Sequence, residues 1–252
     1  MNGLRSVAAT TLALTLVLAA QADPRRSGAT AMSPELQAWQ ADDTRNPAQL
    51  WVGEGQALWQ RAAANGASCA GCHAPQSLAG VALRYPAFDA RLGRALSLAG
   101  RIDQCRQRHQ GLPAQGPDGA EVLPLNAWLA HQGRGLPIAP PADTRLAPAQ
   151  ARGAQIWLQR LGQLNLSCAQ CHEQRAGGRL GGTLIPQAHP TAYPVYRLEW
   201  QALGSLQRRM RGCLVGVRAE PFAPDSADWV ALEAYLMQRA AGMVSEGAGL
   251  RP

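Results

Sequence analysis

The spacing of apolar residues along the chain favours helices over strands. In two segments the apolar side chains recur at helical spacing. In the first, Leu58, Trp59 and Ala62 share one helical face. In the second, Ile156 and Trp157 share such a face with Arg160, which is charged. Two further apolar stretches, 125–129 and 229–237, have the composition of helices that close each half of the chain. The two-residue alternation of a half-buried strand is nearly absent. This pattern predicts an all-α fold.

The N-terminal segment has the pattern of a cleaved signal peptide. A positive charge within residues 1–5 precedes an apolar run at 8–20, and Ala20-Gln21-Ala22 fits a small-residue cleavage site. The run is shorter than the roughly 20 apolar residues that span a bilayer, and no later segment reaches that length. We therefore expect residues 1–22 to be removed and the mature chain to be exported to the periplasm, without insertion into the membrane.

The composition is that of a globular protein, and its cysteines need an explanation in an exported chain. The 252 residues are 46% hydrophobic and carry a formal charge of +7, which suits one or two domains. Six cysteines are present. In an oxidising compartment these thiols are expected to be joined in disulfides or held by a metal or cofactor.

Four of the cysteines belong to two copies of one motif. Cys69-Ala-Gly-Cys72-His73 and Cys168-Ala-Gln-Cys171-His172 both match the C-x-x-C-H pattern of c-type haem attachment. A helical turn brings two cysteines three residues apart to one face, where both can bind one haem while the histidine binds its iron. A zinc site made from the four cysteines would leave both histidines unexplained, and a thioredoxin-like pair is a further alternative. We predict two covalently bound haem c groups.

The sequence around these motifs is also repeated. Trp59 and Trp157 precede the two motifs, and Tyr85-Pro86 and Tyr193-Pro194 follow them. Each tyrosine lies twenty residues before a lone cysteine, since 105 − 85 and 213 − 193 are both 20. An arginine precedes each lone cysteine by four residues, which places cation and sulfur on the same side of a helix. The chain is therefore predicted to be a tandem duplication.

A proline-rich span divides the two copies. We expect the chain to be organised as an N-terminal extension, a first cytochrome c-like domain, a linker and a second, catalytic cytochrome c-like domain, with bounds 23–50, 51–136, 137–150 and 151–252. Haem would supply much of the apolar interior of each domain. The second copy carries an additional glycine-rich loop, RAGGRLGG, between its motif and its Tyr-Pro pair.

The second axial ligand of each iron has several candidates. No methionine lies between Met32 and Met210, so the first haem is left with Cys105, His109 and His131. The second haem has more candidates, namely Met210, Met237, Met243, His189 and Cys213. Only the cysteines are placed equivalently in both copies, which favours thiolate at both irons. A disulfide between Cys105 and Cys213 is the alternative.

Three sequence features together resemble one known family. The paired haem motifs, the segment RIDQC at 101–105 and above all QRRMRGCLVGVRAEPF at 207–222 are similar to the SoxA subunit of the SoxAX cytochromes of bacterial thiosulfate oxidation. The resemblance implies that His73 and Cys105 hold the first iron and that His172 and Cys213 hold the second. It also implies that Cys213 is the catalytic sulfur, often found as a persulfide, and that Arg209 binds substrate.

The same resemblance implies an activity and partners. The chain would be the dihaem subunit of an L-cysteine S-thiosulfotransferase, paired with a SoxX-like monohaem cytochrome that takes up electrons, and would join thiosulfate to a cysteine of a SoxYZ-like carrier protein. The arginines near Cys213 suit a dianion such as thiosulfate, and nothing points to nucleic acid; they are Arg208, Arg209, Arg211 and Arg218. A purely electron-transferring dihaem cytochrome and a dihaem peroxidase are the alternatives.

Overall fold

The computed structural model describes residues 23–223 and 226–252, so the expected signal peptide lies outside the described residues. The helices of the described chain are α1 (Pro34–Ala41), α2 (Gln49–Gln60), α3 (Cys69–Cys72), α4 (Leu98–Cys105), α5 (Val122–His131), α6 (Ala147–Leu158), α7 (Cys168–His172), α8 (Leu206–Gly216) and α9 (Ala227–Arg239). A π-helical turn, Arg106–Gln110, continues α4. No helix in the described ranges is both long and apolar enough to cross a lipid bilayer.

Short strands correct the all-α expectation. They are β1 (Ala87–Asp89), β2 (Arg94–Leu96), β3 (Arg179–Leu180), β4 (Thr183–Leu184), β5 (Val195–Arg197), β6 (Ala202–Gly204) and β7 (Gly249–Arg251). The pairs β1–β2, β3–β4 and β5–β6 are antiparallel, and β7 adds to β5 in parallel. Strands of two or three residues are too short for alternation to be visible in the sequence. The extra glycine-rich loop forms the β3–β4 hairpin.

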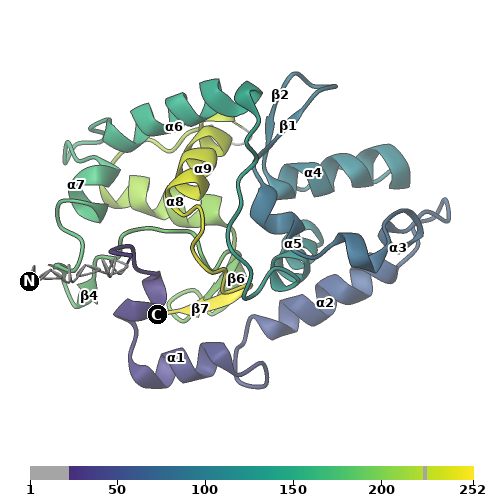
Figure 1. Cartoon of the computed structure of the whole chain (residues 1–252), viewed down its shortest axis with the longest axis horizontal. Helices are drawn as coiled ribbons and strands as arrows, with labels where there is room; N and C mark the ends of the chain where they lie inside the picture. Colours follow the sequence, from purple (N-terminus) through teal and green to yellow (C-terminus); the bar gives the residue numbers. More distant parts are fainter. Residues whose placement is uncertain (1–22, 224–225) are drawn as a thin grey trace, which may run out of the picture.

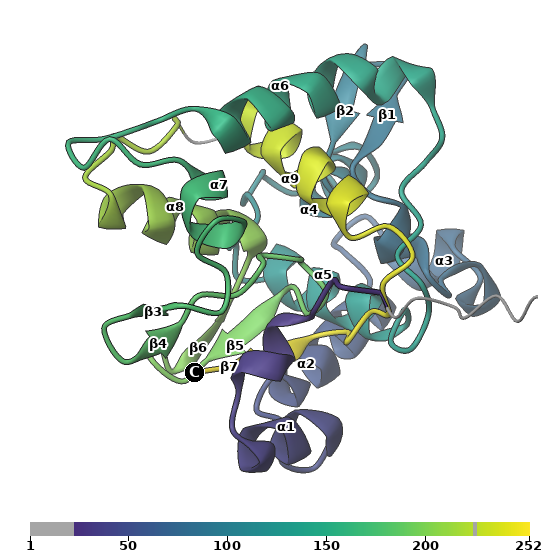
Figure 2. The same ribbon diagram turned by 60° about the vertical axis from the view of Figure 1, so that its left-hand side comes forward.

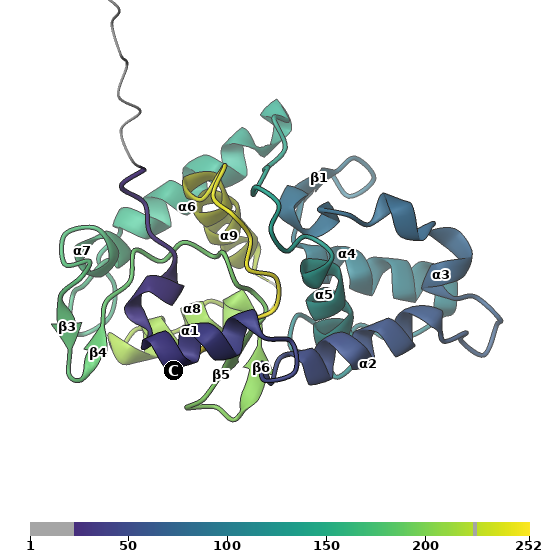
Figure 3. The same cartoon turned by 60° about the horizontal axis from the view of Figure 1, so that its bottom comes forward.

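The two copies of the repeat lie side by side. Figure 1 shows α2 to α5 in one half of the molecule and α6 to α9 in the other, and the same separation is visible in Figure 3. Within each half the order is the same: a long helix, the short motif helix, a two-stranded hairpin, the helix bearing the lone cysteine, and a closing helix. The predicted duplication is therefore visible in the order of elements.

One close helix crossing fixes each half. Helix α2 packs on α5 and α6 packs on α9. A Cβ atom on Gly55 would lie 2.1 Å from the Pro124 carbonyl oxygen, and one on Gly153 would lie 2.1 Å from the Ala231 carbonyl oxygen. Glycine is required at both crossings because no side chain fits between the backbones. Ala62, expected on the apolar face, lies beyond the end of α2 and is exposed.

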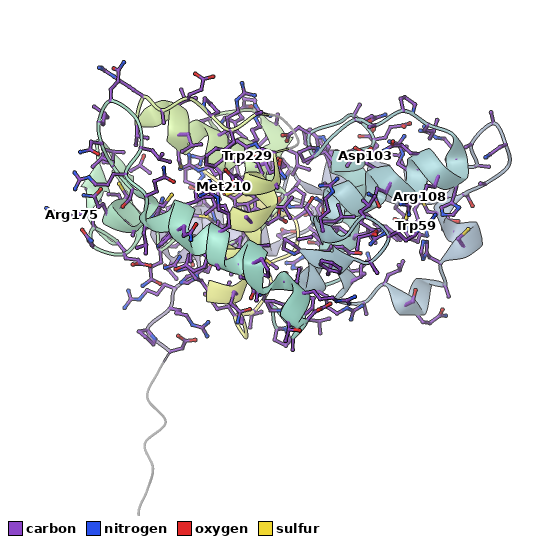
Figure 4. The ribbon with its side chains drawn as sticks, turned by 90° about the horizontal axis from the view of Figure 1, so that it is seen from above. Trp59, Asp103, Arg108, Arg175, Met210 and Trp229 are labelled. Atoms are coloured by element: carbon purple, nitrogen blue, oxygen red, sulfur yellow. The ribbon has the colours of Figure 1, made fainter. Side chains whose placement is uncertain are left out.

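Tryptophans anchor the apolar core of each half. In the first half Trp59 packs against Trp128 with ring centroids 4.7 Å apart, and in the second Trp157 packs against Tyr235 at 5.9 Å. Figure 4 shows Trp59 in one half and Trp229 in the other. The first core extends into the sheet of the second half, since Trp51 packs against Tyr196 at 5.8 Å. The halves are thus joined by apolar packing.

The proline-rich span is held against both halves. Ile138 is 2% exposed and its N–H donates to the Met243 carbonyl, while Ala139 N–H donates to the Leu83 carbonyl. At the N-terminal side α1 lies against β7, as Figure 2 shows. Helix α6 begins at Ala147, within the span expected to be linker. The exact domain boundaries stay a prediction.

Candidate functional site

The two haem motifs form short helices that begin in the same way. Ser68 Oγ accepts a hydrogen bond from Gly71 N at the start of α3, and Ser167 Oγ accepts one from Gln170 N at the start of α7. A serine at this position satisfies a backbone donor that the first helical turn leaves free. In both motifs the capping serine therefore directly precedes the first cysteine, and the two cysteines lie on the same helical turn.

The lone cysteines lie on a second pair of equivalent helices. Ser97 caps α4 and Ser205 caps α8, each through its hydroxyl oxygen. The arginine and cysteine four residues apart fall on one face of each helix. This arrangement brings Arg209 toward the same side of α8 as Cys213.

Each half contains a cavity in which these groups meet. The first cavity is lined by residues that include Cys69, Cys72, His73, Arg101 and Cys105. The second is lined by residues that include Cys168, His172, Arg209 and Cys213. Cys171, one turn beyond Cys168, is half-buried and does not line the cavity. Apart from Cys171, every predicted site residue faces the cavity of its own half.

The two sites differ in how open they are. Cys72 and His73 are exposed, whereas Cys171 and His172 are half-buried. Both histidines lie beside the tryptophan of the preceding long helix, with ring centroids 5.7 Å apart for Trp59 and His73 and 5.9 Å for Trp157 and His172. The geometry of the motif is therefore repeated, and the second copy is more enclosed.

The structure does not bring together the cysteines that a Cys105–Cys213 disulfide or a four-cysteine zinc site would need. All six cysteines are free, and Cys105 and Cys213 line different cavities. Within residues 23–223 and 226–252 no cluster of three or more His, Cys, Asp or Glu side chains could hold a metal ion by itself. The fold therefore contains neither the Cys105–Cys213 disulfide nor the four-cysteine zinc site.

Some of the other candidate axial ligands remain near the cavities. His109 lines the first cavity, and Met210 and His189 line the second. Met237 lines a different cavity between the halves. Among these candidates only the lone cysteines occupy equivalent positions in both cavities.

His172 is held in the orientation that a metal ligand needs. Its Nδ1 lies 2.7 Å from the Pro186 carbonyl oxygen. A carbonyl only accepts, so Nδ1 carries the proton and Nε2 keeps its lone pair for a metal. Burial, opposed by this hydrogen bond, lowers the pKa of His172 below its ordinary value, which favours the neutral imidazole. Sequence motifs do not encode the Pro186 contact.

Unpaired buried donors also suit a haem. Trp59 Nε1 and Arg106 Nη1 line the first cavity without a hydrogen-bond partner among the described residues. A haem carries two propionate carboxylates, which accept hydrogen bonds from such donors. The thiols, the histidines and the apolar lining of both cavities, with these donors in the first, mean that the residues present fit one haem in each half.

Only one of the four arginines near Cys213 lines the cavity. Arg209 does so, whereas Arg208 lies over the Trp200 ring, with its guanidinium carbon 4.4 Å from the ring centroid. Arg208, Arg211 and Arg218 are exposed. The basic run is thus mostly a solvated face, and Arg209 is its one member at the site.

Comparison with known proteins identifies the family. The sequence model described as "SoxA/TsdA, cytochrome c domain" matches residues 54–138 and again residues 152–244, one match in each half. The chain belongs to the SoxA/TsdA cytochrome c family. The resemblance seen in the sequence is confirmed, and so is the cytochrome c nature of both halves.

Individual SoxA proteins match over most of their length. The SoxA subunit of the L-cysteine S-thiosulfotransferase of Rhodovulum sulfidophilum is 32% identical over 93% of this chain and 83% of its own. That of Paracoccus pantotrophus is 34% identical over 83% of this chain and 73% of its own. The crystal structure of SoxXA from P. pantotrophus superposes with a TM-score of 0.86 at 31% identity, covering 90% of this chain and 87% of the other.

Two charged lining residues, Arg197 and Arg251, escaped the sequence analysis of this SoxA/TsdA chain. Arg197, the last residue of β5, lines the second cavity together with Arg209. It lies outside the basic run at 208–218, so charge clustering does not reveal it. The repeat could have revealed it, because Tyr85 to Cys105 and Tyr193 to Cys213 align without a gap and pair Asp89 with Arg197.

Proposed function

We propose that the chain is the dihaem subunit of a periplasmic L-cysteine S-thiosulfotransferase, which joins thiosulfate to a cysteine of a SoxYZ-like carrier protein. One observation carries the proposal: Cys213 and Arg209 line the same cavity as Cys168 and His172 of the second haem motif. A thiol, an anion-binding group and a haem attachment site therefore share one enclosed space. The activity of the related SoxA proteins supports the same reaction.

In this proposal each half holds one haem c. Cys69 and Cys72 attach the first and Cys168 and Cys171 the second, with the motif histidines and the lone cysteines as iron ligands. The contact between His172 and Pro186 orients the imidazole for this task. When bound, haem supplies the one-electron acceptor that the oxidation needs.

The protein's own groups bind and hold the sulfur species. Arg209 binds the oxygens of thiosulfate through charge-assisted hydrogen bonds. A sulfur–sulfur bond forms between the Cys213 thiolate and the terminal sulfur of thiosulfate, and two electrons are released. The thiolate of the carrier then takes the thiosulfate group by exchange and leaves Cys213 as a thiolate again. An added sulfur on Cys213, as a persulfide, would offer an exchangeable sulfur–sulfur bond for this chemistry.

A partner cytochrome completes the electron balance. Two electrons leave for each thiosulfate joined, so a further redox centre must accept them. We propose a SoxX-like monohaem cytochrome, in a heterodimer with this chain, for that role. The likeness to the SoxXA structure supports such a pairing.

The test replaces each lone cysteine in turn. Purified wild type, Cys213→Ala and Cys105→Ala proteins, each with the monohaem partner, are assayed with thiosulfate and the carrier. We expect Cys213→Ala to lose turnover by a factor of about 10² or more, because it removes the group that bonds to substrate. Cys105→Ala serves as the matched control and is expected to keep most of the activity. Mass spectrometry of the whole chain should show two haems and report any added sulfur on Cys213.

Other results would favour the alternatives. If Cys213→Ala still turned over thiosulfate with the carrier, the thiol would be only a ligand and the chain an electron-transfer cytochrome. Rapid turnover of hydrogen peroxide by the wild type, without thiosulfate activity, would instead indicate a peroxidase.

A further inference from the structure

The two sulfur sites of the molecule are built on one backbone plan but differ in one buried charge. From the tyrosine of each hairpin to the lone cysteine the halves match residue for residue, at a constant offset of 108 (193 − 85, 197 − 89, 213 − 105). Asp89 ends β1 opposite Arg94, and Arg197 ends β5 opposite Ala202. A carboxylate in the first half therefore stands where a guanidinium stands in the second.

In the first half the carboxylate neutralises the arginine next to the cysteine. Asp89 Oδ2 lies 2.8 Å from Arg101 Nη1, and the aspartate side chain is 3% exposed. The backbone N–H groups of Leu92 and Arg91 donate to Asp89 Oδ1, and with Arg101 they hold the pKa of Asp89 below its ordinary value. Burial opposes the charge of Arg101, but the Tyr85 hydroxyl and Asp89 raise its pKa. The cation beside Cys105 thus has an anion supplied by the protein.

Among the described residues of the second half, none supplies such a carboxylate to Arg209. Arg209 forms no ion pair with any residue in the described ranges. The side chain of Arg197 is 11% exposed, and its partner Glu199, 3.1 Å away, is 53% exposed. Burial and then the positive charge of Arg209 lower the pKa of Arg197, and Glu199 offsets only part of this. An exposed carboxylate is screened by water and stabilises its partner little.

No side-chain carboxylate of a described residue lines this cavity, although Pro252, which carries the terminal carboxylate, does. Arg251 also lines it, but is neutralised by Glu246 at 2.8 Å. Tyr193 is neutral, and burial raises its pKa further. Arg197 Nε is buried without a hydrogen-bond partner among the described residues. The cavity therefore holds three guanidiniums, of which Arg251 is paired with Glu246, Arg197 is paired with the exposed Glu199, and Arg209 is paired with no described side chain.

A dianion would satisfy this arrangement, and the first cavity has no need of one. Placing two cations near each other in a partly buried space is unfavourable unless a negative charge compensates them. We propose that Arg197 is a second substrate-binding residue, which together with Arg209 binds the oxygens of thiosulfate. We further propose that the exchange of Asp89 for Arg197 decides which of the two cysteine sites takes the oxyanion. This inference rests on the proposed function for the identity of the anion.

The experiment compares Arg197→Gln and Arg197→Lys with Arg175→Gln in the holoprotein with its partner. Arg175 is an exposed arginine at the outer edge of the second half (Figure 4), so its replacement removes the same charge away from the cavity. The KM for thiosulfate is measured, and so is the inhibition constant of sulfate, a tetrahedral dianion that binds without reacting. For Arg197→Gln we expect both constants to rise about tenfold or more, with kcat changed by less than about threefold. Both constants of Arg197→Lys should lie between those of the wild type and Arg197→Gln. Both constants of Arg175→Gln should equal those of the wild type.

Two results would overturn the inference. In the first, Arg197→Gln would have the same KM and sulfate inhibition constant as Arg175→Gln. In the second, Arg197→Gln would shift the haem absorption spectrum and reduction potential while sulfate inhibition stayed the same, which would assign Arg197 to a haem propionate. If the wild type had no thiosulfate activity the proposed function would fail instead, and calorimetric titration with sulfate would still test Arg197.

Discussion

Gly55 of α2 lies so close to Pro124 of α5 that a Cβ atom on Gly55 would stand 2.1 Å from the Pro124 carbonyl oxygen. Real Cβ atoms do not approach an oxygen so closely, so Gly55→Ala must push the two helices apart. Overpacking of this kind costs about 1–3 kcal/mol. In a chain of this size we expect the melting temperature to fall by about 2–4 °C for each kcal/mol, measured by circular dichroism of the holoprotein.

The same helix offers a matched control. Gly53 is also inside α2, but a Cβ atom there would meet nothing within 4 Å. Alanine is favoured over glycine in a helix interior by about 0.5–1 kcal/mol, so Gly53→Ala should raise the melting temperature slightly. Equal effects of the two substitutions would show that the close crossing does not limit stability.

The sequence predicted those parts of the fold that carry a local signal. The two haem motifs, the helices leading into them and the two closing helices all lie where the apolar spacing and the repeat placed them. The helical faces were predicted to extend to Ala62 and Arg160, but α2 ends at Gln60 and α6 at Leu158. The hairpins were missed because a three-residue strand has no detectable period.

The site was predictable where its residues form a motif and not where they meet through the fold. The pairs that the resemblance implies as iron ligands, His73 with Cys105 and His172 with Cys213, line common cavities, and their role as ligands stays a prediction. The Pro186 carbonyl beside His172 could not be foreseen, because a backbone acceptor has no sequence signature. The opposed charges at Asp89 and Arg197 were present in the repeat, but their meaning depends on burial and on the Arg101 ion pair.

A carboxylate from the first half holds the start of the helix that bears Cys213. Asp118 Oδ1 accepts from Ser205 N at 2.8 Å, and its Oδ2 accepts from Ser205 Oγ at 2.9 Å. Ser205 is 4% exposed, so Asp118→Ala would leave its N–H buried without an acceptor. Such a loss costs about 1–3 kcal/mol. We expect calorimetry to show a lower melting temperature for Asp118→Ala.

The asparagine variant separates hydrogen bonding from charge. In Asp118→Asn the amide oxygen can still accept from Ser205 N while the amide nitrogen donates to the hydroxyl. Its melting temperature should therefore lie much nearer to the wild type. If both variants were equally destabilised, the charge of Asp118 would matter and the hydrogen-bond geometry would not.

Thiosulfate binding should weaken as salt is added. The attraction between a dianion and the guanidiniums of Arg197 and Arg209 is screened as the Debye length falls from about 30 Å at 0.01 M to about 8 Å at 0.15 M ionic strength. We expect the KM for thiosulfate to rise severalfold over this range, with sodium chloride as the added salt. The rise should be smaller in Arg209→Gln, which has less charge to screen. A KM independent of salt in the wild type would argue against electrostatic capture.

Glu233 should make the stability of the protein fall as the pH rises. It lines the cavity between the halves, and burial raises its pKa from 4.5 to about 7. Between these values the unfolded chain releases the proton while the folded chain keeps it, so rising pH favours unfolding, by up to about 3 kcal/mol. Glu233→Gln cannot ionise and should gain stability relative to the wild type between pH 5 and pH 8, measured by urea unfolding at each pH.

The control is Glu54→Gln, on the exposed side of α2. Its free energy of unfolding should differ from that of the wild type by the same small amount at every pH. The other titrating groups are common to the variant and the wild type, so their contributions cancel in each difference. The assignment would be wrong if the difference between Glu233→Gln and the wild type stayed constant with pH, since a carboxyl in water would already be ionised at pH 5.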